Sequence, residues 1–277
     1  MSRFMLSYVE RSSPVHALTG AVKLIVFLLW SVIAMAGYDI RVMVVIVALG
    51  IILFVVSGTK ISEVSLIFKM LGLFMFLNLA GIYLFFPEQG VAIYGSRHVI
   101  LAGASRFTLT AEQLFYELNI FLKYCMIVPP AILLIVTTQP SEFAASLNRI
   151  GVHYYLAYAV SLTLRYIPDV QRDYLAISHA QQARGIELSR KTSLPKRIRG
   201  AAAILLPLII STLDRIDVVS HAMELRSFGK YKKRTWYSGK PFGRADVAVL
   251  VVSAALFGFG MWFIFRDGDR FYNPFRP

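Results

Sequence analysis

The sequence predicts an all-α, polytopic membrane protein with about five transmembrane helices and additional amphipathic helices on the cytoplasmic side. Hydrophobic residues make up 57% of its 277 residues, charged residues only 16%, and the mean hydropathy is +0.61. A soluble domain has about 45–50% apolar and about 25% charged residues. In addition, apolar runs of about 20 residues, the length that a helix needs to cross a bilayer, recur along the chain.

Five apolar stretches have this length. They are residues 21–37, 40–57, 65–86, 115–136 and 245–265. Soluble core helices rarely recur at such length, so we predict about five spans. The glycine-rich connector at residues 87–113 contains two short extended runs around Gly95 and Ser96, which predict a small external hairpin.

The predicted domains are an N-terminal membrane domain (1–136) with four spans, a cytoplasmic region (137–243), and a last span with a tail (244–277).

The charge pattern predicts on which side of the membrane the loops lie. Between Arg165 and Arg244 lie 16 of the 29 Lys and Arg residues and only six acidic residues, so +10 of the net charge of +13 lies there. Positively charged loops stay cytoplasmic, so this block and the N-terminus are both expected inside the cell.

One further span would place the C-terminus outside, although Arg266, Arg270 and Arg276 argue mildly against this.

A nucleic-acid-binding protein could carry the net charge but would not carry so much apolar sequence, so no nucleic-acid partner is expected. The basic runs at residues 190–199 and 230–234 are interpreted mainly as anchors near anionic lipid headgroups of the bilayer.

Three helices are predicted in the basic region. The first covers residues 143–150, the second runs from residue 154 to 183, and the third runs from about residue 201 to 226. Pro168 is expected to kink or divide the second helix, because proline lacks the amide that closes the preceding turn. Gly185 and Gly229 lie just past the last two helices, where glycine can take the left-handed conformation that ends a helix.

The last two helices end in comparable chemistry, because Arg184 and Arg226 each lie at a helix C-terminus. A single cation there usually only complements the helix dipole, which is worth about 0.3–1 kcal/mol. Two similar endings in one amphipathic segment instead favour a docking device. A guanidinium suits that role, because its planar donors match carboxylates and carbonyls of a partner.

The stretch Thr137-Thr138-Gln139-Pro140-Ser141-Glu142-Phe143 is followed by Leu162-Thr163-Leu164-Arg165-Tyr166-Ile167-Pro168 and then by Gln181-Gln182-Ala183-Arg184-Gly185. Together with the opening Ser13-Pro14-Val15-His16-Ala17-Leu18, these motifs resemble the T component of energy-coupling factor transporters. The resemblance covers nearly the whole chain.

The resemblance implies a membrane scaffold that docks on two cytoplasmic ATP-binding-cassette ATPases and holds a membrane-embedded, substrate-binding S component. In that family two coupling helices cross in an X, and each ends in an Ala-Arg-Gly motif that fits a groove on one ATPase. The first motif corresponds to Ala183, Arg184 and Gly185. The second corresponds to Leu225, Arg226 and Ser227, where only the arginine matches and Gly229 is an alternative source of the tight helix end.

The resemblance also implies an apolar contact surface for the S component, called the platform, on the faces of the coupling helices. The residues assigned to it are Leu147, Ile150, Tyr154, Tyr155, Leu156 and Tyr158. Packing of these residues against the chain itself is an equally good interpretation.

No phosphate-binding GxxxxGK[ST] loop is present, so ATP is expected on the partner subunits and no catalytic, metal or cofactor site is assigned to this chain. The expected cargo is a vitamin or vitamin precursor, with a transition-metal ion as a weaker alternative.

Two other classes remain open. A self-contained secondary transporter would need intramembrane ionisable pairs or repeated broken helices, which are not evident. A membrane enzyme would need clustered acids or histidines, for which Asp169, Asp173 and His179 are the nearest candidates. Pairing with Arg165 and Arg172 explains the two aspartates more simply.

Overall fold

The structure is a computed structural model, and it describes residue 11 and residues 13–101, 107–186, 193–231, 235–237, 239–266 and 271–275. The chain divides into two compact units. We call Met1–Glu142 with Lys240–Pro277 the span unit, and Phe143–Gly239 the arm unit. Each is described by itself.

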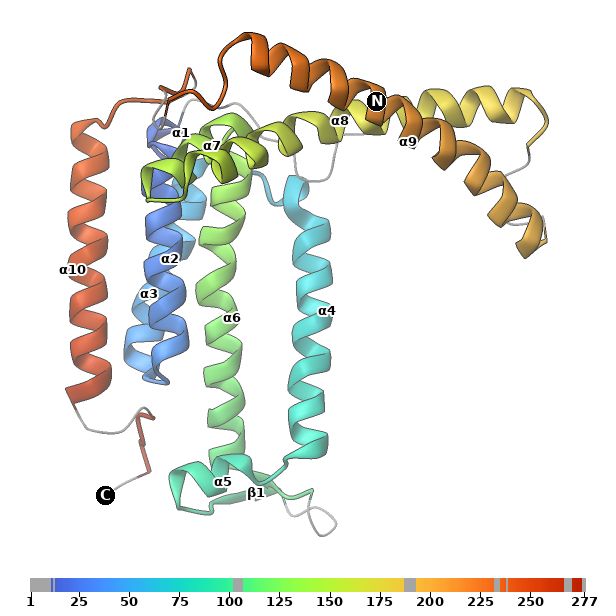
Figure 1. Ribbon diagram of the computed structural model, residues 1–277. Helices are drawn as coiled ribbons and strands as arrows, with labels where there is room; N and C mark the ends of the chain where they lie inside the picture. Colours follow the sequence, from blue (N-terminus) through green and yellow to red (C-terminus); the bar gives the residue numbers. More distant parts are fainter. Residues whose placement is uncertain are drawn as a thin grey trace. The chain divides into compact units, whose positions relative to one another are not determined.

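The span unit contains five long helices that run side by side (Figure 1). They are α2 (Gly20–Ala36), α3 (Ile40–Ser57), α4 (Ile61–Phe85), α6 (Ala111–Thr137) and α10 (Arg244–Arg266). The last four are long and apolar enough to cross a membrane, and α2 is a shorter apolar helix of 17 residues. At 1.5 Å per residue, α2 is about 26 Å long, close to the thickness of the hydrocarbon core. The predicted all-α membrane fold is confirmed.

The helix α6 is the centre of the span unit, because α2, α3 and α4 all pack against it. Apolar side chains of four helices form the main core, with Trp30 and Ile33 of α2 each only 2% exposed. Its buried members also include Val22, Val26, Ala34, Met43, Ile46, Met126 and Ile264. In α4, by contrast, Val64 is the one buried residue, so most of this helix faces outward.

The two ends of the span unit can be told apart by its contacts. The backbone N–H of Thr19, at the start of α2, donates to Asp246 near the start of α10 (2.9 Å). At the other end, the ring of Phe271, beyond α10, stacks on Tyr38, which follows α2 (centroids 4.3 Å apart). The tail after α10 therefore lies at the opposite end from the start of α2. Of the tail arginines, Arg270 and Arg276 lie outside the described residues.

The connector between α4 and α6 differs from the predicted hairpin. Its first expected strand is the helix α5 (Gln89–Tyr94), and the strand β1 (Val99–Leu101) pairs antiparallel with β2 (Leu109–Thr110). Pairing around Gly95 and Ser96 was therefore the wrong prediction. The reason is the buried carboxylate of Glu112, which accepts hydrogen bonds from the Ser96 hydroxyl and the His98 backbone and draws this segment onto the start of α6.

A short helix, α1 (Pro14–Ala17), precedes α2, and α7 (Pro140–Arg149) begins in the span unit and ends in the arm unit. The arm unit continues with α8 (Tyr154–Ala183) and α9 (Leu194–Leu225). Pro168 does not divide α8, because a proline removes only one backbone hydrogen bond and long helical segments flank it. The helix α9 starts earlier than predicted, with Pro195 in its first turn, where proline is well tolerated.

The helices α8 and α9 run in opposite directions and cross (Figure 1). The Gln181 side chain near the end of α8 donates to the Ala203 carbonyl near the start of α9 (3.2 Å). At the other end of the pair, the Tyr155 hydroxyl donates to the carbonyl of Gly229, just beyond α9 (3.2 Å). With a rise of 1.5 Å per residue, the two C-terminal ends lie on the order of 40 Å apart.

Candidate functional site

The end of α8 forms a Schellman motif, the tight helix stop that satisfies the last free carbonyls. Ala183 is the last helical residue and Arg184 is the C-cap. The N–H of Gly185 donates to the Gln182 carbonyl (2.9 Å), and the N–H of Ile186 donates to the Gln181 carbonyl (3.1 Å). Gly185 has a φ of +85°, a conformation that glycine adopts without steric cost.

The end of α9 has the same geometry although its sequence differs. The N–H of Ser227 donates to the Glu224 carbonyl (2.9 Å), and the N–H of Phe228 donates to the Met223 carbonyl (2.9 Å). Ser227 has a φ of +55° and is the one non-glycine residue with positive φ in the described part of the chain. That conformation costs a non-glycine residue about 1–2 kcal/mol. The alternative that Gly229 supplies the helix stop is therefore wrong.

The two motifs correspond position by position. Arg184 and Arg226 are both C-cap residues, and both are exposed. The helix α7 also ends in this geometry, at Gly151, but the residue at its cap is Ile150. The tight stop is therefore a general feature of the arm unit, whereas an exposed arginine at the cap distinguishes the ends of α8 and α9.

The surroundings of the two caps differ sharply. A Cβ atom added to Gly185 would meet no described atom within 4 Å, so there is free space beside this residue, although Gln181 one turn earlier is hydrogen-bonded to α9. Beyond α9, Phe228 packs among aromatic side chains from the start of α8, at 4.5 Å from the ring of Tyr158. Trp236 also belongs to this group, with its ring centroid 5.5 Å from that of Tyr154. Its Nε1–H donates to Asn148 Oδ1 (3.2 Å).

We call this group the aromatic anchor. Its members are Tyr154, Tyr155, Tyr158, Phe228 and Trp236. The anchor was not predicted from the sequence, because it joins the start of α8 to residues 228–236, which are distant along the chain. The spacing of Tyr154 and Tyr158 on one helical face was the available signal.

Three of the six predicted platform residues, Tyr154, Tyr155 and Tyr158, thus have partners within the arm unit. Leu147 and Ile150 are half-buried, whereas the Leu156 side chain is 63% exposed. Leu156 and the 46% exposed Tyr155 are the most accessible of the six.

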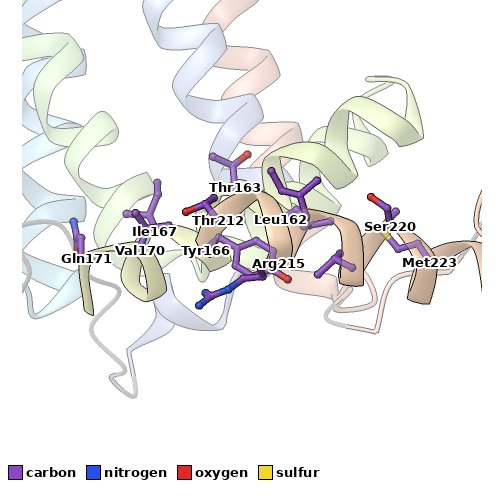
Figure 2. Close-up of a pocket in the computed structure, with 12 residues that line it drawn as sticks. Leu162, Thr163, Tyr166, Ile167, Val170, Gln171, Thr212, Arg215, Ser220 and Met223 are labelled. Atoms are coloured by element: carbon purple, nitrogen blue, oxygen red, sulfur yellow. The ribbon is translucent and has the colours of Figure 1, made fainter. Parts of the chain in front are cut away.

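A groove of about 520 Å³ lies between α8 and α9 (Figure 2). Its walls are mostly apolar and include Leu162, Ile167, Val170, Ile216, Val219 and Met223. Arg215 also lines the groove and forms an ion pair with Asp173 (2.7 Å).

The aspartates considered for catalysis are in ion pairs. Asp169 pairs with Arg172 (3.5 Å), as predicted, whereas Asp173 pairs with Arg215 of α9 rather than with a neighbour on its own helix. Within the described residues, no group of three or more His, Cys, Asp or Glu side chains is placed to hold a metal ion.

The basic runs are described only in part. Lys196, Arg197 and Arg199 are exposed on the first turns of α9, beside the exposed Leu194 and Ile198. Arg190, Lys191, Lys232, Lys233 and Arg234 lie outside the described residues. The interpretation as lipid anchors stays a prediction.

These features define a class: a polytopic, all-α membrane protein with an arm of two crossed helices that each end in an arginine cap. Comparison with known proteins gives the family. The sequence model of the CbiQ family, described as cobalt transport protein, matches residues 11–237. The chain belongs to this family of membrane transport proteins.

Relatives with a printed name support this family assignment. The chain is 27% identical to the energy-coupling factor transporter transmembrane protein EcfT of Lactococcus lactis subsp. cremoris, over 89% of this chain and 91% of that protein. It is 29% identical to the EcfT of Bacillus selenitireducens, over 88% of this chain and 91% of that protein. With the EcfT of Bacillus subtilis it shares 26% identity over 90% of this chain and 95% of that protein.

Proposed function

We propose that this chain is the transmembrane scaffold subunit of an energy-coupling-factor importer. Two cytoplasmic ATPases would hydrolyse ATP, and the chain would transmit their movement to an S component that carries a vitamin or related micronutrient. The chain itself would be non-catalytic and bind no cofactor. The relatives that share most of its length are transmembrane proteins of energy-coupling factor transporters by name, which supports this role.

The observation that carries the proposal is the pair of matching helix ends. Arg184 and Arg226 occupy the same cap position, are exposed, and lie at opposite ends of the crossed helices. Two equivalent arginine caps on the order of 40 Å apart suit two similar ATPases that each offer one groove. A guanidinium at the cap can donate in its plane to carboxylates or carbonyls of such a groove.

The mechanism is mechanical. When ATP draws the ATPases together, each would carry its arginine cap along, so that α8 and α9 change their crossing angle. The apolar groove between them is the space that such a change would widen or narrow. Exposed apolar residues near the start of α8, Leu156 and Tyr155 among the six platform residues, would carry the change to the S component.

The test is a double charge reversal, Arg184→Glu with Arg226→Glu, followed by affinity purification in detergent with the cognate ATPases. Repulsion and loss of two charged contacts should weaken association at least about 30-fold, while membrane insertion is unchanged. The control is Arg165→Glu with Arg172→Glu, which makes the same charge change on exposed positions of α8. Normal co-purification of both ATPases with the Arg184/Arg226 variant would contradict the proposal.

The substrate class has its own experiment. The description of the matched family names cobalt, whereas the names of the relatives contain no substrate. Purification of the wild-type chain with its native partners, followed by mass spectrometry of the co-purifying membrane chains, identifies the S component. A vitamin-binding subunit is the expected result, and a metal-binding subunit would change the proposed cargo.

A further inference from the structure

A second apolar groove lies wholly within the span unit, between α3, α4 and α6, and has a volume of about 390 Å³. We call it the span groove. None of the described residues that line it is charged, and Tyr124 of α6 contributes its one hydroxyl group.

The span groove exists because α4 packs closely against α6 only near its own start. There Val64 is buried together with Ile132 and Val136 of α6, and the ring of Phe68 meets that of Phe54 edge-on (centroids 6.0 Å apart). One turn beyond Phe68, the groove wall contains Gly72, and a Cβ atom added there would meet no described atom within 4 Å. The missing side chain therefore leaves this part of the space beside α4 unfilled.

The span groove opens to the surroundings of the bundle. All three helices that form it are long and apolar enough to cross a membrane, and Ile51 and Ile61 on its walls are 56% and 67% exposed. A bound water molecule needs two to four polar partners, which this apolar wall does not supply. The occupant must therefore be apolar, either a lipid chain or a protein helix.

The dimensions of the span groove favour a lipid chain. The groove follows α4 from Ile61 to Met75, which at 1.5 Å per residue is about 21 Å. This length exceeds the hydrocarbon thickness of one leaflet, about 15 Å, so it accommodates an extended chain from one leaflet. A helix of the same length and about 10 Å in diameter has a volume of roughly 1,600 Å³, about four times that of the groove.

The charge at the start of α4 favours an anionic headgroup. Lys60 is the N-cap residue of α4, directly precedes Ile61 and is exposed. The acidic residue nearest to it along α4, Glu63, forms an ion pair with Arg11 (2.7 Å). These three side chains together carry a net positive charge, which attracts anionic lipid at the membrane surface.

We infer that the span groove is a binding site for one acyl chain of an anionic phospholipid, whose headgroup lies at Lys60. The bound chain fills the space that Gly72 leaves open and so completes the packing of α4, in which Val64 is the one buried residue. This site goes beyond the proposed function and does not depend on it, because no ATPase or S component contributes to it.

The test is photo-crosslinking of the full chain in nanodiscs of phosphatidylcholine that contain a trace of phosphatidylglycerol with a diazirine in one acyl chain. Mass spectrometry then locates the attached lipid. Val128 lines the span groove, whereas Val251 of α10 is 63% exposed outside it and serves as a reference of the same residue type. Attachment should be several times higher at Val128 than at Val251.

Two substitutions on α4 test whether the groove itself holds the chain. Gly72→Phe places a ring in the span groove and should lower attachment at Val128 to the level at Val251. Gly81→Phe is the matched control, because Gly81 also has free space around it but does not line the groove, and it should change nothing. Equal attachment at the two valines in the wild type, or unchanged attachment at Val128 in Gly72→Phe, would overturn the inference and leave the groove to side chains of a partner protein.

The headgroup is tested by repeating the experiment with phosphatidylcholine that carries the same diazirine. The wild type should show roughly fivefold more attachment of phosphatidylglycerol than of phosphatidylcholine at Val128, because one lysine contributes about that factor near a membrane surface. Lys60→Gln should bring the two lipids close to equal attachment. A ratio that Lys60→Gln does not change would overturn the assignment of the headgroup to Lys60.

Discussion

The ends of α8 and α9 share one backbone geometry but differ in what holds them. Both are Schellman stops with arginine at the cap, yet nothing lies within 4 Å of a Cβ at Gly185, whereas Phe228 beyond α9 is packed into the aromatic anchor. The two caps are thus held by different contacts: the α8 end by the hydrogen bond from Gln181 to the Ala203 carbonyl of α9, and the α9 end by aromatic packing against the start of α8.

This difference has a mechanical consequence. A force applied at Arg226 passes through Phe228 and the anchor into the first turns of α8, which follow α7 after a short turn. A force applied at Arg184 acts at the far end of the same helix, on the order of 40 Å away. Under the proposed function, the two ATPases would therefore act on opposite ends of α8.

The largest expected effect comes from removing the anchor. Phe228→Ala should destabilise the α9 end by roughly 2–3 kcal/mol, less than the 3–5 kcal/mol of a fully buried phenylalanine because Phe228 is half-buried. Hydrogen exchange followed by mass spectrometry should show faster exchange in residues 222–230 and 154–160, and no change in residues 178–185. Tyr237→Ala is the matched control, because that ring is fully exposed. Equal exchange in wild type and Phe228→Ala would show that the anchor does not hold this end.

A smaller effect of opposite sign is expected at the two left-handed residues. Gly185→Ala should destabilise the α8 end by about 1 kcal/mol, because alanine is strained at a φ of +85°. Ser227→Gly should stabilise the α9 end by about 0.5–1 kcal/mol, because it relieves the same strain. Amide exchange of Ile186 and Phe228, the donors of the closing hydrogen bonds, reports each change. Equal signs for the two substitutions would contradict the equivalence of the caps.

Hydrophobic patterning made most of the fold predictable. All five apolar stretches are helices, and α8 has the predicted bounds, because long apolar or amphipathic periodicity depends on local sequence alone. The predicted start of α9 and the predicted strand pairing in the connector were wrong, because they depend on features other than hydrophobic periodicity. Pro195 permits an earlier first turn, and the buried Glu112 decides how the connector folds.

The candidate site was predictable in its residues but not in its surroundings. Arg184 and Arg226 follow from helix-end patterns, and the motif Leu225-Arg226-Ser227 could be aligned only at its arginine. Ser227 itself adopts the left-handed conformation, which local propensity disfavours for serine, and the adjacent Phe228 packs in the aromatic anchor. The contacts of Thr19 with Asp246 and of Glu142 with Lys240 join distant segments, so no local pattern indicates them.

The most direct test of the account uses the two arginines one at a time. Arg184→Glu and Arg226→Glu are each purified without nucleotide in the presence of both ATPases, and the number of ATPase subunits per chain is measured by native mass spectrometry. If the two caps are separate docking points, each single variant retains one ATPase and loses the other, and the two variants lose different ones where the ATPases differ. Retention of both ATPases by either single variant, or loss of the same subunit from both, would contradict the central claim.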